Sequence, residues 1–151
     1  MKRTSFEDAD CPVARSLDSI GDWWSLLIVR DVLAGKRRFG ELQKGLGMAK
    51  NILAARLRKL VERGILEHQP AADGSAFSEY VPTERGHKLF PVLVALRQWG
   101  LDNYFQCGEP YRELVDRKKG KPLAKMEVRA ADGRVLAPED TRFLALAAKA
   151  A

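Results

Sequence analysis

The residues between positions 36 and 64 carry the clearest chemical pattern in this chain. This segment, KRRFGELQKGLGMAKNILAARLRKLVERG, holds nine Lys and Arg against two acids, Glu41 and Glu62. Its local charge of +7 compares with a formal charge of +6 for all 151 residues, so the rest of the chain sums to −1. When basic side chains neutralise the phosphates of a nucleic acid, condensed counterions are released, which favours binding. This segment therefore predicts a nucleic-acid partner. The alternative is a solvated basic helix face.

Other chemistry-bearing residues do not form a catalytic or metal-binding pattern. The two histidines, His68 and His87, and the two cysteines, Cys11 and Cys107, are single and widely separated. A thiol-dependent enzyme needs a Cys–His–acid set, and structural zinc needs about four Cys or His ligands. We therefore expect no enzyme activity, no cofactor and no bound metal.

The composition is that of an ordinary soluble protein, with 46% hydrophobic and 30% charged residues. No apolar run approaches the roughly 18 residues of a membrane span. The first residues, MKRTSFEDADCP, lack the apolar stretch of a signal peptide. We expect a cytoplasmic protein with reduced thiols, built as one domain or as a domain with an appendage.

Four helices are predicted to position the basic segment. Apolar spacing, caps and glycines place them at residues 12–20, 23–34, 40–46 and 49–63. In the last of these, Leu53, Leu57 and Leu60 share one face. The opposite face presents Asn51, Ala54, Ala55, Arg58 and Glu62. Small side chains allow close approach to a surface, while Asn and Arg can hydrogen-bond base edges or phosphates, so this helix is predicted to enter the major groove. The alternative is a surface helix whose cations confer solubility.

A β-hairpin is predicted directly after this helix. Residues 65–69 and 78–82 have strand composition, and the Asp73-Gly74 pair between them favours a turn. A hairpin after a basic helix indicates a winged helix–turn–helix, so the predicted fold is mainly α with a small β-hairpin wing (α+β). The wing stretch ADGSAF contains no Lys or Arg, and contacts from the helix are therefore predicted to dominate DNA affinity.

A long apolar helix is predicted from Thr83, which can cap it, with Pro91 either kinking or dividing it. Its apolar residues exceed what one small domain needs, so side chains such as Trp99 are expected in the core or in a dimer interface. The predicted organisation is a DNA-binding and dimerisation domain at residues 1–103 and a C-terminal extension at 104–151. The extension contains the basic run RKKGKP and a second hairpin pattern at Asp132-Gly133.

The order of these motifs resembles the HxlR-type transcriptional regulators, a winged-helix group related to the MarR-type regulators. The resemblance covers residues 10–101 and rests on CPVARSLDSIGDWWSLLIVRDVL, RRFGEL, LRKLVERGIL, SEYVPTERG and PVLVALRQWG. It implies a homodimer that binds a palindromic operator, with two half-sites matching the two-fold symmetry of the protein. The expected function is a sequence-specific repressor. The alternative is a winged helix that binds protein instead of DNA, which has no need of the +7 segment.

The resemblance also implies roles for individual residues. Arg38 is expected at the phosphate backbone, and Arg58 at a phosphate or base edge. Arg56 is expected either at DNA or in a structural salt bridge. The expected DNA-binding set is Arg37, Arg38, Lys50, Asn51, Ala54, Ala55 and Arg58, and the expected dimer interface includes Val13, Leu17, Leu93, Leu96 and Trp99. Ala49 and Ala54 stand where the family usually has Ser or Thr, so phosphate anchoring or base preference is expected to differ.

Cys11 is a candidate redox sensor. It precedes the first helix, whose positive N-terminal end favours the reactive thiolate, and some regulators similar to this chain sense oxidants or electrophiles with the corresponding cysteine. The alternative is a thiol kept for packing. In some relatives the C-terminal extension resembles a zinc ribbon with CG turns. The comparable turns here are Lys119-Gly120 and Asp132-Gly133, so a metal-free ribbon remnant is expected.

Overall fold

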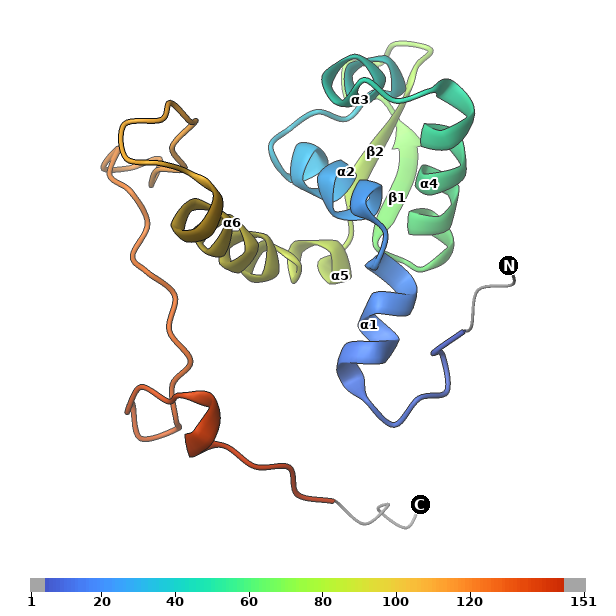
Figure 1. Ribbon diagram of the computed structural model, residues 1–151. Coiled ribbons are helices and arrows are strands. Elements are labelled where there is room, and N and C mark those ends of the chain that lie inside the picture. Colours follow the sequence, from blue (N-terminus) through green and yellow to red (C-terminus); the bar gives the residue numbers. More distant parts are fainter. Residues whose placement is uncertain (1–4, 146–151) are drawn as a thin grey trace. The chain divides into compact units, whose positions relative to one another are not determined.

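The computed structural model describes residues 5–145, and the chain divides into two compact units, Met1–Leu96 and Arg97–Ala151. The first unit begins with the helices α1 (Pro12–Ile20), α2 (Trp23–Leu33), α3 (Phe39–Leu46) and α4 (Lys50–Glu62) (Figure 1). The antiparallel strands β1 (Leu66–Pro70) and β2 (Ser78–Pro82) follow, and then α5 (Glu84–His87) and α6 (Phe90–Tyr104), which continues into the second unit. The predicted α+β fold with its hairpin is confirmed.

Local interactions set the ends of the helices around the basic segment. Pro12 lies in the first turn of α1, where its missing N–H leaves no hydrogen bond unmade. Glu41 reaches back along α3 and accepts hydrogen bonds from the amides of Arg38 and Arg37, each at 3.0 Å. These two backbone bonds lower the pKa of the Glu41 carboxyl. Gly47, at a φ of +65°, ends α3 in the left-handed conformation that glycine tolerates, so the chain turns sharply into α4.

One apolar core holds α2, α3, α4 and β1 together. Its innermost side chains, at most 1% exposed, are Ile28, Val29, Val32, Leu42, Leu53, Leu57, Leu60 and Leu66. Fully burying one leucine of this kind contributes about 1.5–3 kcal/mol to stability. The three leucines predicted for one face of α4 all lie in this core. The opposite face of α4 is therefore left at the surface.

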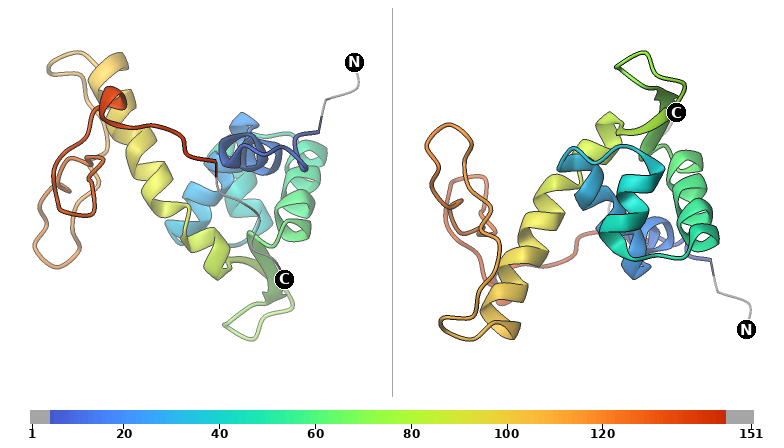
Figure 2. Two further views of the ribbon diagram at one scale, coloured as in Figure 1. Left: turned by 90° about the horizontal axis from the view of Figure 1, so that it is seen from below. Right: turned by 90° about the horizontal axis from the view of Figure 1, so that it is seen from above.

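The hairpin is joined to the start of α3. His68 lies opposite Tyr80 in the strand register, and their rings stack with centroids 4.7 Å apart. The Tyr80 amide donates a hydrogen bond to the Arg37 carbonyl at 2.8 Å, which links β2 to the segment before α3. The loop between the strands projects from the hairpin, which lies beside α4 (Figure 2). At the end of β2, the Thr83 hydroxyl caps α5 as predicted, accepting the Gly86 amide at 3.1 Å.

The predicted long helix is divided between residues 87 and 90 into α5 and α6. Pro91 lies in the first turn of α6, where a residue without an N–H is best tolerated, so the break falls just before it. Val92, Leu96 and Trp99 follow at helical spacing and are 42%, 48% and 55% exposed. One side of α6 therefore carries an apolar stripe that is not covered by its own core.

The second unit has little regular structure after α6. Isolated antiparallel bridges join Val115 to Pro122 and Arg129 to Val135, so the hairpin predicted at Asp132-Gly133 is reduced to a turn closed by one bridge. A short 3-10 helix follows at Pro138–Asp140. The division at Leu96 lies inside α6, earlier than the boundary predicted at residue 103.

Within residues 5–145, no three His, Cys, Asp or Glu side chains gather as a group that could hold a metal ion. No helix in the same part of the chain is long and apolar enough to cross a membrane.

Candidate nucleic-acid interface

The outward face of α4 carries a line of exposed residues. Asn51, Ala55 and Arg58 follow one another at spacings of four and three residues and are all exposed, whereas Ala54 is half-buried. Lys50 is exposed in the first turn, directly after the N-cap residue Ala49. Ala49 makes no side-chain cap, so the first amides of α4 keep the capacity to bind an anion. The face thus has a small side chain, Ala55, in its middle and hydrogen-bond donors, Asn51 and Arg58, before and after it.

Five of the nine cations in residues 36–64 are engaged by the protein itself. Lys36 pairs with Asp31 at 2.8 Å, and Arg63 pairs with Asp18 at 3.2 Å. The complete group is Lys36, Arg38, Arg56, Lys59 and Arg63. Because these contacts hold side chains in place and compensate much of their charge, the +7 of the sequence overstates what the surface offers to a ligand.

Four cations of the segment make no ion pair and no side-chain hydrogen bond within residues 5–145. They are Arg37, Lys44, Lys50 and Arg58, and all four are exposed. They come from the segment before α3, the end of α3, and the first and middle turns of α4. Lys44 is missing from the DNA-binding set predicted from the sequence. The sequence shows Lys44 only as one of nine cations. The structure sets it apart, because five of the other cations are engaged by the protein and Lys44, in the described residues, is not.

Arg56 has the structural role that the sequence left open. Its Nε lies 3.4 Å from the Asp22 carboxylate. Asp22 is also the N-cap of α2 and accepts the Ser25 amide at 3.0 Å. Arg56 therefore connects α4 to the first turn of α2, and it helps to orient the helix whose outer face carries Arg58.

Arg38 is bound by the wing. Its guanidinium forms an ion pair with Asp73 and lies 5.2 Å from the centroid of the Phe77 ring. It is also 3.4 Å from the Ser75 hydroxyl and 3.9 Å from the Glu79 carboxylate. The sequence predicts that Arg38 faces the phosphate backbone. In this structure the carboxylates of the hairpin surround it, and it braces the wing against the start of α3.

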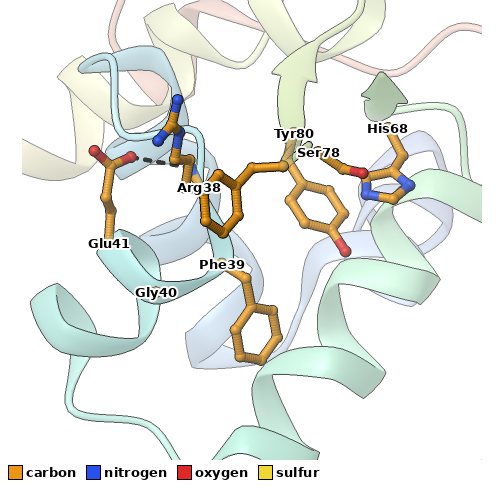
Figure 3. Close-up of a pocket in the computed structure, with 8 residues that line it drawn as sticks. Arg38, Phe39, Gly40, Glu41, His68, Ser78 and Tyr80 are labelled. Carbon is orange, nitrogen blue, oxygen red and sulfur yellow. Dashed lines mark hydrogen bonds between the residues drawn. The ribbon is translucent and has the colours of Figure 1, made fainter. Parts of the chain in front are cut away.

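A pocket of about 450 Å³ lies between the hairpin and the start of α3 (Figure 3). It is lined by Arg38, Phe39, Gly40, Glu41, His68, Phe77, Ser78 and Tyr80. Most of these side chains offer aromatic or apolar surface. Because they come from both elements, the shape of the pocket depends on how the wing is held, and thus on the contact between Arg38 and Asp73.

We expect the Asp73 contact to make stability depend on pH in the acid range. Hydrogen bonds from Ser75, followed by the contact with Arg38, lower the pKa of Asp73 to about 2 from an ordinary value of 3.8. A depressed pKa gives stability that is present above pH 3.8 and is lost as the pH falls through about 2. Between pH 5 and pH 2, the free energy of unfolding measured in urea should therefore decrease less in Asp73→Asn than in the wild type.

Asp8→Asn is a matched control, because Asp8 is exposed and its side chain makes no ion pair or hydrogen bond within residues 5–145. It should follow the wild-type curve. Parallel curves for Asp73→Asn and the wild type would contradict an energetic role for this contact.

The residues predicted for the dimer interface divide into two groups. Val13, Leu17, Leu96 and Trp99 are 66%, 51%, 48% and 55% exposed, respectively. Leu93 instead packs against the core of its own unit. Among the predicted interface residues, the exposed apolar side chains thus lie on α1 and on the outer stripe of α6.

Cys11 is the N-cap residue of α1 and is exposed, as is Cys107 in the second unit. Neither belongs to a disulfide in the described residues. In the single chain the Cys11 thiol is therefore accessible, as a reactive thiol requires.

The family model for HxlR-like helix-turn-helix domains matches residues 19–107. A curated relative, the uncharacterised HTH-type transcriptional regulator MT3179 of Mycobacterium tuberculosis (strain CDC 1551 / Oshkosh), is 44% identical over 111 residues. That alignment covers 74% of this chain but 63% of the relative, so this chain spans less than two thirds of the length of that protein.

Solved structures show the same fold. The crystal structure of PA1607, a proposed transcription factor, is 57% identical, with a TM-score of 0.88, and covers 93% of this chain and 98% of its own. The redox regulator HypR, in its oxidised form, is 31% identical with a TM-score of 0.55. It covers 64% of this chain and 100% of its own. HypR therefore lacks a counterpart to about a third of this sequence, whereas PA1607 matches nearly all of it.

Proposed function

This chain belongs to the HxlR-like helix-turn-helix family of transcriptional regulators, and we propose from this premise that it binds a palindromic operator as a homodimer and represses transcription. The observation that carries the proposal is the outer face of α4. Its three leucines are buried, while Lys50, Asn51 and Arg58 are exposed and both cations are unpaired in the described chain. A helix packed on one side and cationic on the other suits the major groove.

The contacts on this face divide by chemistry. Asn51 and Arg58 offer the donors that read base edges, and Ala55 lets the helix approach the groove closely. Arg37, Lys44 and Lys50 are suited to phosphates, together with the uncapped amides at the start of α4. Arg38 acts indirectly in this scheme, by positioning the wing.

Two copies are joined through α1 and α6 in this proposal. The exposed stripe of Val92, Leu96 and Trp99 supplies an apolar surface, and Val13 and Leu17 on α1 supply another. Covering such side chains contributes about 25 cal/mol for each Å² removed from water. A two-fold dimer presents two α4 helices, so each reads one half-site of a palindrome.

Fluorescence anisotropy tests the proposal with a duplex from upstream of this protein's own gene and a scrambled duplex, each at about 50 and 200 mM salt. The four unpaired cations predict that the helix–turn–helix contributes up to about −3.6 per protomer to the slope of log K against log salt, at −0.9 per phosphate. Tight, salt-dependent preference for the upstream duplex supports the regulator. A flat salt profile contradicts it, and absence of binding at low salt favours the protein-binding alternative.

We further propose that Cys11 regulates DNA binding through thiol oxidation. Its exposed position at the start of α1 and the similarity to HypR, which is named a redox regulator, support this role. Because α1 carries dimer surface in this proposal, a disulfide or adduct at Cys11 would alter the dimer geometry.

Cys11→Ser is expected to bind the operator like the wild type but to lose the response to diamide, as measured by anisotropy before and after oxidation. Cys107→Ser is the companion variant, because its thiol is also exposed but lies in the second unit. It should keep the response, and loss of the response in this variant as well would identify Cys107 as the thiol that pairs with Cys11. If Cys11→Ser still responds to diamide, Cys11 is not the sensor.

A further inference from the structure

The positive charge of the second unit is concentrated in one turn. Residues 97–151 carry eleven Lys and Arg against eight Asp and Glu, a net charge of +3. Residues 115–122, VDRKKGKP, which we call the basic hairpin, contain four cations and one acid, also +3. The remainder of the unit therefore sums to zero. The charge is a property of this turn and not of the extension as a whole.

Backbone hydrogen bonds hold the basic hairpin in a tight turn. A bridge between Val115 and Pro122 closes it, and the Asp116 amide donates to the Lys121 carbonyl at 2.8 Å. The Asp116 carboxylate accepts the amides of Lys118 and Lys119, at 3.2 and 2.9 Å. Gly120, at a φ of +65°, makes the reversal. These bonds hold the turn, and they point the Asp116 carboxylate at backbone amides and not at the cationic side chains.

The cations of the basic hairpin are exposed and unpaired, whereas most of the other Lys and Arg side chains described in the second unit form ion pairs. Arg117, Lys118, Lys119 and Lys121 make no ion pair or side-chain hydrogen bond within the described part of the chain. Elsewhere in the unit, Lys125 pairs with Asp102 at 3.0 Å and Arg134 pairs with Asp132 at 2.9 Å. Four unpaired cations on one short turn, offset by a single carboxylate, repel each other, and an external polyanion relieves that repulsion.

We propose that the basic hairpin is a second DNA-contacting element, which binds the phosphate backbone of a duplex without reading its sequence. The inference rests on the proposed function and assigns a role to a part of the chain outside the helix–turn–helix. Phosphate contacts of this kind add affinity and position the protein, while base contacts by α4 supply specificity.

The composition of the hairpin favours a duplex backbone over other polyanions. It contains no aromatic residue, so it has no platform on which single-stranded bases could stack. Its tip, RKKGK, has no Trp, Phe or Leu that could enter a membrane interface. The wing offers no competing cation, because ADGSAF contains no Lys or Arg and its Asp73 is paired with Arg38.

The basic hairpin lies outside the region that the family model matches, which ends at residue 107. The match to HypR uses all of that chain but only 64% of this one, whereas the match to PA1607 covers 93%. The domain that the family shares therefore does not include the basic hairpin. A contact made by the extension adds to the contacts of that domain and does not replace them.

The test compares the wild type with a quadruple variant, Arg117→Gln, Lys118→Gln, Lys119→Gln and Lys121→Gln, which keeps Asp116 and Gly120 and therefore the turn. We expect the affinity for the upstream and scrambled duplexes to fall by a similar factor, about tenfold or more at 100 mM salt. The salt slope should decrease in magnitude by up to about 3.6 per protomer, at 0.9 per lost phosphate contact. Hydroxyl-radical footprints should lose protection at the phosphates that the hairpin contacts. Arg134→Gln, in the other turn of the extension, is the matched control and should bind like the wild type.

Failure of this proposal is distinguishable from failure of the proposed function. Unchanged affinity and slope in the quadruple variant, with the wild type still preferring the upstream duplex, overturn only the role of the hairpin. Equal affinity of the wild type for both duplexes, reduced in the variant, supports the hairpin and contradicts operator recognition. If the variant loses binding to phosphatidylcholine–phosphatidylglycerol vesicles but keeps its DNA affinity, the hairpin binds membranes and the proposal is wrong.

Discussion

Replacing Arg58 by alanine is expected to weaken operator binding by about 1–3 kcal/mol, a loss of roughly 5- to 150-fold in affinity. Arg58 lies in the middle of α4, is exposed, and has no partner in the described chain. Its removal therefore leaves no buried group unsatisfied, and the free energy of unfolding should change by no more than about 0.5 kcal/mol. The loss should appear in binding alone.

The pattern of the loss identifies the atom that Arg58 contacts. If it reads a base edge, specificity should relax at one position of each half-site. If it contacts a phosphate, affinity should fall equally for all sequences, and the salt slope should decrease by about 1. Anisotropy titrations against the operator and its single-base variants distinguish the two cases.

Lys88→Ala is the matched control for charge. Lys88 pairs with Glu84 on α5 at 2.8 Å, away from α4 in the sequence, so the variant removes one cation but no proposed DNA contact. Its operator affinity should stay close to that of the wild type. A change below a few tenths of a kcal/mol in Arg58→Ala itself would remove Arg58 from the interface.

Leu96→Asp is expected to produce monomers at concentrations at which the wild type is a dimer, with a dissociation constant raised at least about 100-fold. The reason is the cost of burying an unpaired carboxylate in an apolar interface, which amounts to several kcal/mol. Leu96 is 48% exposed in the single protomer, so the aspartate remains solvated there and the fold is kept. Sedimentation velocity measures the dissociation constant directly.

Loss of the dimer should also remove most of the operator affinity. In a dimer, binding of one α4 to its half-site places the second α4 at a high effective concentration near the other half-site. A monomer loses this gain, so we expect its affinity to fall by about 100-fold or more. Val128→Asp is the control, since Val128 is also an exposed apolar side chain, at 68%, but belongs to the extension. A monomeric Val128→Asp with a dimeric Leu96→Asp would place the interface on the extension.

Much of the fold follows from interactions between neighbours in the sequence. The spacing of Leu53, Leu57 and Leu60 predicts the buried face of α4, because helical geometry alone brings residues three and four positions apart to one side. The cap at Thr83 and the break near Pro91 are local as well, since each depends on backbone groups within one turn. These features could be predicted because their physical causes lie within a few residues.

The charge available to DNA could not be predicted in this way. Arg38 and Asp73 lie 35 residues apart in the chain, and Arg63 and Asp18 lie 45 apart. Whether such groups meet depends on how the core packs α2, α3, α4 and the hairpin together. Local patterns in the sequence account for the helices, the strands, the family motifs and the total charge. Which cations are paired follows from the tertiary structure, because electrostatic contacts depend on distance in space, which the packing of distant segments sets.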